Sequence, residues 1–337
     1  MSGWVCRRDG QALRADAGAL VCAACGAAAP IRDGIALFAD SDTALAELQR
    51  SEPELEAFWR RIQQHGLAQA TARLAQDRGL AHTVFSSDWR FFLPRPRGGR
   101  VLQLGAGLGD DTAELCAGAG EVVALVPSLL HGRVLRARLP QREHPNLLVG
   151  ALAGLDRLPL ADRSVDAIVM EQAGAEGFGL AAHNLGAAAA EWRRVLAPGG
   201  TLVATSSNPW WTLGVLRWLR GSHGPRRPAL NRWIQRAGAA RRGRPISTSV
   251  LSRGLQRHGF EAPELYAPLP DQERTEAVVP IQDRRALLYF LDNLVRRGAG
   301  PARLAIAAAK LLAVCGLLSR VAPDTILRFR PAVPERG

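Results

Sequence analysis

The sequence predicts an α/β protein built on a doubly wound parallel sheet, and three observations lead to this expectation. From residue 100 onward, apolar runs that read as buried strands alternate with helix-compatible segments, which indicates a parallel sheet with helices on both faces. The first of these runs ends in three glycines at alternate positions. The composition, 47% hydrophobic and 22% charged, is that of a folded chain rather than a disordered one.

The stretch from Arg100 to Thr112 is the centre of this prediction. Its apolar run leads into Gly105, Gly107 and Gly109, and a helix-compatible segment follows from 112 to 119. Glycines let the backbone turn sharply out of a buried strand and let a ligand approach main-chain N–H groups. The spacing G-x-G-x-G differs from the dinucleotide fingerprint G-x-G-x-x-G, so we expect a ligand loop of another kind.

Further strands and turns follow at regular spacing. In open α/β sheets, ligands bind beyond the carboxyl ends of the parallel strands, so the residues after each strand are candidate ligand contacts. We expect strands at 121–126, near 147–149, within 162–171 after a turn, and at 201–204 after the Pro-Gly-Gly of residues 198–200.

These segments resemble, in order and spacing, the class I S-adenosylmethionine-dependent methyltransferases with a type 11-like domain. The resemblance covers about residues 98 to 210, and its most specific parts are the glycine motif and the R-V-L-x-P-G-G run at 194–200. It implies a Rossmann-like methyltransferase sheet with S-adenosylmethionine as cofactor. In this family the glycine loop wraps the methionine part of the cofactor.

The resemblance also shows which cofactor anchors this chain lacks. The acidic residue that the family has in the first strand is Gln103 here, the ribose-binding carboxylate is Val126, and the adenine-side aspartate falls on Gly154. Asp156, two residues further on, is the expected substitute. The implied cofactor-binding residues are Gln103, Gly105, Ala106, Gly107, Gly109, Val126, Pro127, Asp156 and Leu158.

The acceptor side is expected at the ends of the fourth and fifth strands and in the loop between them. Glu171, Asn208 and His183 are the candidate catalytic residues there. Each has a structural alternative: Glu171 as a helix cap, Asn208 as part of a turn with Pro209, and His183 as an exposed loop residue. Two functions stay open, an active methyltransferase and a catalytically degenerate methyltransferase-fold protein that acts as a binding or scaffold partner.

Cys22 and Cys25 form a C-x-x-C knuckle followed by glycine, a pattern that suits tetrahedral zinc, and the run P-I-R-D-G-I follows at 30–35. With these motifs, residues 1–40 resemble the zinc-ribbon module, like the tRNA-methyltransferase activator protein, that precedes many bacterial methyltransferase domains. In the first knuckle Cys6 is followed by Asp9 where a second cysteine belongs. The missing cysteine favours a ribbon that has lost its metal, and a Cys3Asp zinc site is the alternative.

The remaining chain divides by pattern and composition. Leucines at helical spacing predict a helical linker or lid at 41–97, before the cofactor-binding core at 98–209. A basic segment rich in Trp and Arg at 210–245 is expected to be a helical lid, with contact to an anionic membrane as the alternative. Residues 246–337 are expected to complete the sheet and add helices.

The chain carries 43 basic and 31 acidic residues, a net charge of +12, which favours acidic partners or reflects an arginine-rich proteome. No nucleic-acid-binding module is recognisable, so we expect no specific nucleic acid as a partner. A cytoplasmic protein is expected, peripheral at the inner membrane face if the basic segment binds lipid. Resemblance of the C-terminal part to methyltransferases of bacterial cell-surface glycan gene clusters implies a small-molecule or glycan- or lipid-linked acceptor.

Overall fold

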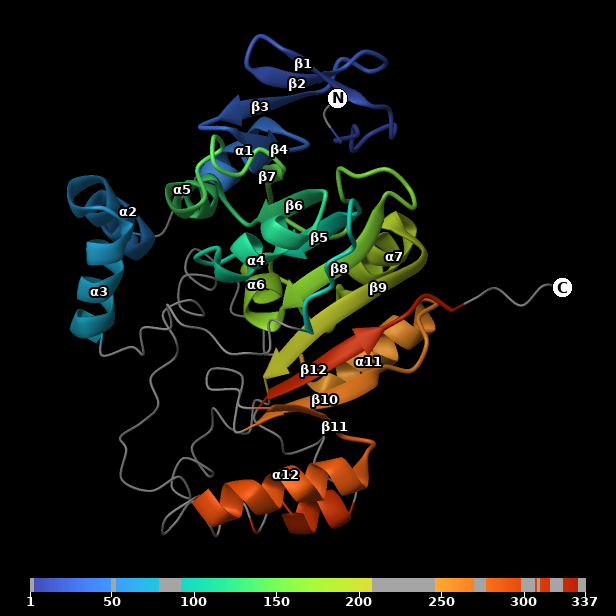
Figure 1. Cartoon of the computed structure of the whole chain (residues 1–337). Helices are drawn as coiled ribbons and strands as arrows, with labels where there is room; N and C mark the ends of the chain where they lie inside the picture. Colours follow the sequence, from blue (N-terminus) through green and yellow to red (C-terminus); the bar gives the residue numbers. More distant parts are fainter. Residues whose placement is uncertain are drawn as a thin grey trace, which may run out of the picture.

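The computed structural model describes residues 3–49, 53–78, 92–207, 246–269, 277–297, 307, 310–315 and 324–332. One twelve-stranded sheet runs through this part of the chain, in the order β1-β2-β3-β4-β7-β6-β5-β8-β9-β12-β10-β11 (Figure 1). The strands are β1 (Leu13–Asp16), β2 (Ala19–Cys22), β3 (Ala28–Arg32), β4 (Ile35–Phe38), β5 (Arg100–Leu104), β6 (Glu121–Val126), β7 (Leu147–Leu152), β8 (Val165–Glu171), β9 (Leu196–Ser207), β10 (Glu264–Leu269), β11 (Ala277–Pro280) and β12 (Asp324–Phe329).

The helices of the described residues connect these strands or flank them. They are α1 (Asp42–Gln49), α2 (Pro53–His65), α3 (Leu67–Arg78), α4 (Asp110–Gly118), α5 (Leu129–Arg138), α6 (Gln172–Gly177), α7 (Leu185–Val195), α11 (Thr248–Arg257) and α12 (Arg284–Arg297). Within this part of the chain, no helix has both the length and the apolar character needed to cross a membrane.

The centre of the sheet is parallel and doubly wound, as the sequence predicted. Strand β5 pairs in parallel with β6 on one side and with β8 on the other, and β7 and β9 continue the sheet outward. Because successive side chains of a strand point to opposite faces, β5 and β6 supply two separate cores. Leu102 and Leu104 pack on the face covered by α7, whereas Val101 packs with residues of α4 and α5 on the other.

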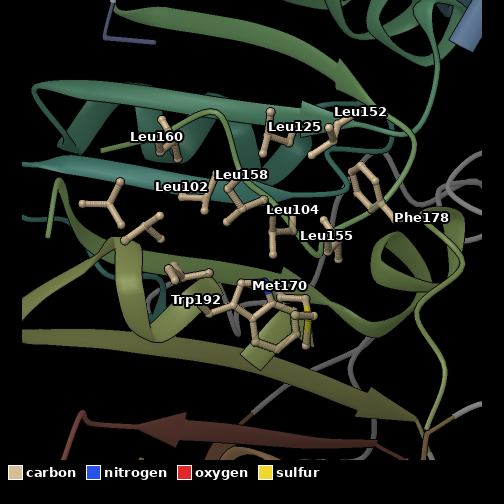
Figure 2. Packing of buried hydrophobic residues seen from close by; sticks show 14 of the residues in the cluster. Leu102, Leu104, Leu125, Leu152, Leu155, Leu158, Leu160, Met170, Phe178 and Trp192 are labelled. Atoms are coloured by element: carbon tan, nitrogen blue, oxygen red, sulfur yellow. The ribbon is translucent and has the colours of Figure 1, made fainter. Parts of the chain in front are cut away.

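The first of these cores also holds the loop that follows β7. Figure 2 shows Leu155 and Leu158 of this loop packed beside Leu102 and Leu104 of β5, with Trp192 of α7 below them. Trp192 is fully buried and is the largest such side chain in the described residues. The loop is therefore fixed to the sheet by apolar side chains, although it has no regular secondary structure.

The N-terminal ribbon is joined to this sheet. Strands β1 to β4 form an antiparallel meander, and β4 then pairs in parallel with β7. Trp4 and Phe38 stack against each other with ring centroids 4.9 Å apart, and both lie over Gly150 of β7, where a Cβ atom would come within 3.0 Å of each ring. The sequence predicted a small separate module, and the difference arises because β7 has an open edge on which β4 completes hydrogen bonding.

The Pro-Gly-Gly run of residues 198–200 lies within β9 instead of preceding it. Leu196 pairs with Val165, and pairing resumes only at Thr201 with Ala167, so the residues between form an irregularity in the strand. Gly199 has a positive φ of 76°, a conformation that a side chain disfavours. The predicted turn is thus a bulge at the start of a longer strand.

Beyond β9 the sheet changes direction. Strand β12 runs antiparallel to β9, and β10 and β11 follow as antiparallel neighbours, with α12 packed beside β11 at the end of the sheet farthest from the ribbon (Figure 1). The expected completion of the sheet by residues 246–337 is therefore found. The domain boundaries stay predictions, and the basic segment at 210–245 lies outside the described residues.

Candidate functional site

The glycine loop lies where the sequence predicted it, between the carboxyl end of β5 and the start of α4. Gly105, Gly107 and Gly109 have φ angles of 77°, 53° and 83°, all in the left-handed region that L side chains rarely adopt. The Gly105 N–H donates to the carbonyl oxygen of Leu125 at 3.0 Å, which ties the turn to β6. Glycine is thus required at all three positions by backbone conformation.

Helix packing encloses this loop. Every residue from Val101 to Thr112 is buried. Leu108, within the loop, shares a cluster with Leu130 and Val134 of α5 and with residues of the α2–α3 pair, which stands beside α5 in Figure 1. The helical segment after the ribbon therefore packs against Leu108 of the glycine loop, and its role as a linker or lid stays a prediction.

Helix α4 begins directly after the loop and turns its first N–H groups toward it. Asp110 and Asp111 in its first turn are both buried, and Asp110 pairs with Arg138 of α5 at 2.6 Å. Gln103, on β5, accepts a hydrogen bond from Thr112 at 2.7 Å, and both side chains are buried. The residue that replaces the family's first acid is therefore bound inside the protein, linking β5 to α4.

The end of β6 places an apolar side chain at the expected ribose position. Val126 is 1% exposed and packs in the core against α5, and its hydrocarbon side chain has no atom that could hydrogen-bond to a ligand. After Pro127, Ser128 caps α5, and its hydroxyl lies 2.7 Å from Nδ1 of His131. This buried pair was not among the predicted residues, and its only sequence signal is a serine three positions before a histidine at a helix start.

Asp156 lies beside the position of the missing adenine-side acid. Gly154 has no side chain, and a Cβ atom placed there would come within 2.9 Å of Oδ1 of Asp156. The Asp156 carboxylate therefore lies next to the point where a side chain at 154 would begin, and the residue is exposed. Leu158, the other predicted contact of this loop, is 1% exposed and belongs to the core.

The structure describes two of the three candidate catalytic residues, Glu171 and His183. Glu171 ends β8 and lies at the N-cap position of α6, but its side chain makes no capping hydrogen bond. His183 is exposed in the turn before α7. Because the end of α7 leads into the start of β9, the beginning of α7 lies at the opposite edge of the sheet, which is the edge that carries the glycine loop. Asn208 lies outside the described residues. The roles of all three stay predictions.

The N-terminal ribbon brings together the four residues that the sequence proposed as metal ligands. One ligand atom from each of Cys6, Asp9, Cys22 and Cys25 lies within 4.8 Å of the others. The two knuckles have matching turns, in which the Gly10 N–H donates to the Cys6 carbonyl at 2.9 Å and the Gly26 N–H donates to the Cys22 carbonyl at 3.0 Å. Asp9 thus occupies the place of a second knuckle cysteine.

The four groups interact strongly with one another. The Sγ atoms of Cys6 and Cys25 are 3.5 Å apart, and Cys22 donates to Oδ2 of Asp9 at 3.2 Å. The backbone N–H of Gln11 and the neighbouring thiols lower the pKa of Asp9 to about 2. The backbone N–H of Ala27 lowers the pKa of the Cys25 thiol, but Asp9, burial and the other two thiols together raise it to about 12. A cation bound in this cluster would pair with the Asp9 carboxylate and favour the thiolate form of the cysteines.

The segment that contains the glycine loop is similar to known methyltransferases. Residues 102–204 match the family described as methyltransferase domain. Proteins named uncharacterized methyltransferase in Mycobacterium bovis and in two strains of Mycobacterium tuberculosis are each 41% identical over 107 residues, which is 31% of this chain and 37% of theirs. The chain therefore matches little more than a third of the length of these relatives. The matched segment contains the glycine loop, the carboxyl-terminal part of β5, all of β6 to β8 and most of β9.

Two solved structures are similar over more of the chain. A phosphoethanolamine N-methyltransferase 2 of Haemonchus contortus with S-adenosyl-L-methionine is 12% identical with a TM-score of 0.43, covering 82% of this chain and 60% of that one. A complex of the Haloferax volcanii Trm112 methyltransferase activator with a methyltransferase is 15% identical with a TM-score of 0.44, covering 84% and 99%. Likeness at this level carries no information about the substrate.

We predict that Gly109→Ala destabilises the fold more than Gly66→Ala. Both glycines have positive φ angles, so each substitution costs about 1–2 kcal/mol in backbone strain. At Gly109 the new methyl would also lie 2.7 Å from Leu135 and 3.2 Å from Leu139, whereas nothing lies within 4 Å at Gly66. Overpacking adds about 1–3 kcal/mol. Urea unfolding of both variants measures this difference, and equal losses would show that the loop can move away from α5.

Proposed function

We propose that this protein is an S-adenosylmethionine-dependent methyltransferase. The observation that carries the proposal is the glycine loop. It follows β5, a central strand of the sheet, and its three glycines have left-handed backbone conformations. The loop also lies within the segment that matches the methyltransferase domain. Ligands bind at this edge in open α/β sheets. A conformation held by glycine at three positions, with helix N–H groups directed at the turn, fits the carboxylate end of the cofactor's methionine part.

Binding of the nucleoside end would differ from the family pattern. Val126 is buried in the core and has no hydrogen-bonding group for the ribose, while Asp156 has a carboxylate beside Gly154 that can accept hydrogen bonds on the adenine side. The residues therefore fit the cofactor with two differences from the family pattern. The ribose-binding carboxylate is missing at Val126, and the adenine-side carboxylate comes from Asp156 instead of residue 154. Losing an acceptor that binds a ligand's polar group costs about 1.5–3 kcal/mol, so we expect weaker binding than in a domain with all its anchors.

Methyl transfer requires little from the protein beyond positioning. The bound cofactor supplies the methyl group and a good leaving group, so the chain mainly has to hold an acceptor in line and exclude water. Glu171 and His183, at the same edge as the glycine loop, are the described residues that could orient the acceptor or take its proton. A catalytically degenerate binding protein is the other candidate, and Val126 is the observation that favours it.

We expect S-adenosylhomocysteine to bind the intact protein and Asp156→Ala to weaken that binding about ten- to a hundredfold. Asp156 is exposed, so its removal leaves the stability of the fold within about 0.5 kcal/mol. Isothermal calorimetry measures both affinities. Asp16→Ala, an exposed aspartate at the end of β1, is the matched control and should bind normally. No heat from the wild-type protein at millimolar ligand would leave only the degenerate alternative.

We further propose that the ribbon binds zinc through three cysteines and Asp9. In a tetrahedral site with Zn–S bonds of about 2.3 Å, ligand atoms lie about 3.8 Å from one another. The contacts of 3.5 Å between Cys6 and Cys25 and 3.2 Å between Cys22 and Asp9 are close to those edges. The geometry therefore supports the Cys3Asp alternative over a metal-free ribbon.

Purified protein should contain about one equivalent of zinc per chain, and Cys22→Ser should lose it. Asp9→Cys should bind zinc more tightly, because it completes a four-cysteine site. Cys315→Ser, an exposed cysteine outside the ribbon, serves as the control and should keep its zinc. Metal analysis after dialysis against a chelator gives the stoichiometry. Zinc below a tenth of an equivalent in the wild-type protein would favour the ribbon that has lost its metal.

For the acceptor we propose a small molecule or a glycan- or lipid-linked molecule, and of these we favour the lipid-linked one. Four large apolar side chains are exposed at the α12 end of the sheet, which supports contact with an amphipathic molecule or an anionic lipid surface. They are Tyr289, Phe290, Leu311 and Val314, exposed by 64%, 37%, 65% and 46%, with the exposed Arg284 and Arg285 at the start of the same helix.

Incubation with methyl-labelled cofactor and a cell extract should therefore place label in the organic phase after solvent extraction. A Tyr289→Ser/Phe290→Ser double variant should label that phase several-fold less, because its exposed apolar surface is smaller. Its cofactor affinity should be unchanged, since α12 lies at the far end of the sheet from the glycine loop (Figure 1). Label confined to the aqueous phase would contradict a lipid-linked acceptor.

A further inference from the structure

The loop of residues 153–160, which carries Asp156, is held from two sides. On one side, Glu191 of α7 accepts a hydrogen bond from the Leu158 N–H at 2.8 Å. Arg194 donates to the carbonyl oxygens of Leu158 at 3.1 Å and Leu160 at 2.8 Å. Hydrogen bonding to Glu191 raises the pKa of Arg194, so its positive charge is fixed. Helix α7 therefore anchors the carboxyl-terminal half of the loop.

On the other side, the loop is held by the first knuckle of the ribbon. Nε of Arg7 donates to the carbonyl oxygen of Arg157 at 2.9 Å, and the Arg157 guanidinium donates to the carbonyl oxygen of Arg8 at 2.6 Å. The Val5 N–H donates to the carbonyl oxygen of Pro159 at 3.1 Å. These three bonds join segments that are about 150 residues apart in the sequence, and they surround the residue that follows Asp156.

Arg7 also ties this contact to the sheet. Its guanidinium pairs with Asp40 at 2.7 Å, and Asp40 follows β4, the strand that lies beside β7. The Arg7 side chain is only 11% exposed, so the pair is shielded from solvent on the arginine side. A largely buried arginine that bridges two chain segments holds a defined geometry, because its planar fork presents its donors in fixed directions.

The same turn carries two of the four candidate metal ligands. Arg7 follows Cys6 directly and precedes Asp9 by two residues, and the turn closes through the bond from Gly10 to the Cys6 carbonyl. The metal cluster and the loop with Asp156 thus share one short stretch of backbone. A ligand that fixes the turn therefore also restricts the position of Arg7.

We propose that Arg7 is a positioning residue for the cofactor, and that the first knuckle couples the metal cluster to the loop of residues 153–160. The inference rests on the proposed function, in that Asp156 is taken as the adenine-side contact. Gly154 gives this loop more conformational freedom than other residues would, so its placement depends on such external contacts. Coupling of this kind is reciprocal: zinc in the ribbon strengthens cofactor binding, and bound cofactor strengthens zinc binding.

Arg7→Ala tests the positioning role, and Arg14→Ala, an exposed arginine on β1 of the same ribbon, is the matched control. Hydrogen exchange of peptides spanning 152–160 in the ligand-free protein should become about fivefold faster in Arg7→Ala and stay unchanged in Arg14→Ala. Affinity for S-adenosylhomocysteine should fall by about the same factor. Arg7→Lys, which keeps the charge opposite Asp40 but loses the planar fork, should give an intermediate result. Unchanged exchange in a folded Arg7→Ala variant overturns the proposal.

The coupling to metal is tested on the wild-type protein alone. Exchange of the 152–160 peptides is compared between zinc-loaded protein and protein treated with a chelator, with peptides of α12 as the internal reference. Faster exchange confined to 152–160 and the ribbon after chelation supports the coupling, and equal exchange overturns it. Because these measurements use no cofactor, they remain decisive if S-adenosylhomocysteine fails to bind, an outcome that would count against the proposed function instead.

Discussion

The parallel pairing of β5 with β6 and β8 is the constraint on which the other features depend. Parallel strands place their carboxyl ends at one edge, so the ends of β5, β6, β7 and β8 lie together although Leu104 and Glu171 are far apart in the sequence. The glycine loop, the Ser128–His131 pair and Asp156 follow strands of this set, and Glu171 ends one of them. Two apolar cores, one on each face of β5, keep these ends in register.

Polar side chains at this edge bond to other side chains of the protein, whereas the family pattern implies that Gln103 binds the cofactor. Gln103 bonds to Thr112 inside the protein, and Ser128 bonds to His131, so both side chains stabilise helix starts. Val126 fills the core where a carboxylate would face a ligand. The edge thus combines a glycine loop of left-handed backbone conformation with polar side chains that bond inside the protein. Burying paired polar groups in this way avoids the cost of leaving them unsatisfied when no ligand is present.

The ribbon brings its first knuckle into contact with the loop after β7 at this sheet edge. Since β4 extends the parallel part of the sheet by one strand, its end at Asp40 and the first knuckle come next to the loop after β7. A module that the sequence presents as an independent unit therefore lies against the loop that carries Asp156. In the coupling that we propose, metal binding that orders the first knuckle also restricts the loop of residues 153–160. The link is made by the hydrogen bonds of the Arg7 and Arg157 side chains, each of which reaches the backbone of the other segment.

The parallel strands and helices of residues 100–204, the glycine loop and the four candidate ligands of the ribbon were predictable from the sequence, because they follow from local apolar periodicity, backbone preference and short spacings. The sequence also indicated that Asp156 lies near the position of the missing acid. It did not reveal the pairing of β4 with β7, the bulge within β9, or the clamp between Arg7 and Arg157. These features depend on which distant backbones meet at a sheet edge, so they became visible only in the folded chain. Nothing in the local sequence of residues 35–38 or of Arg7 specifies its partner.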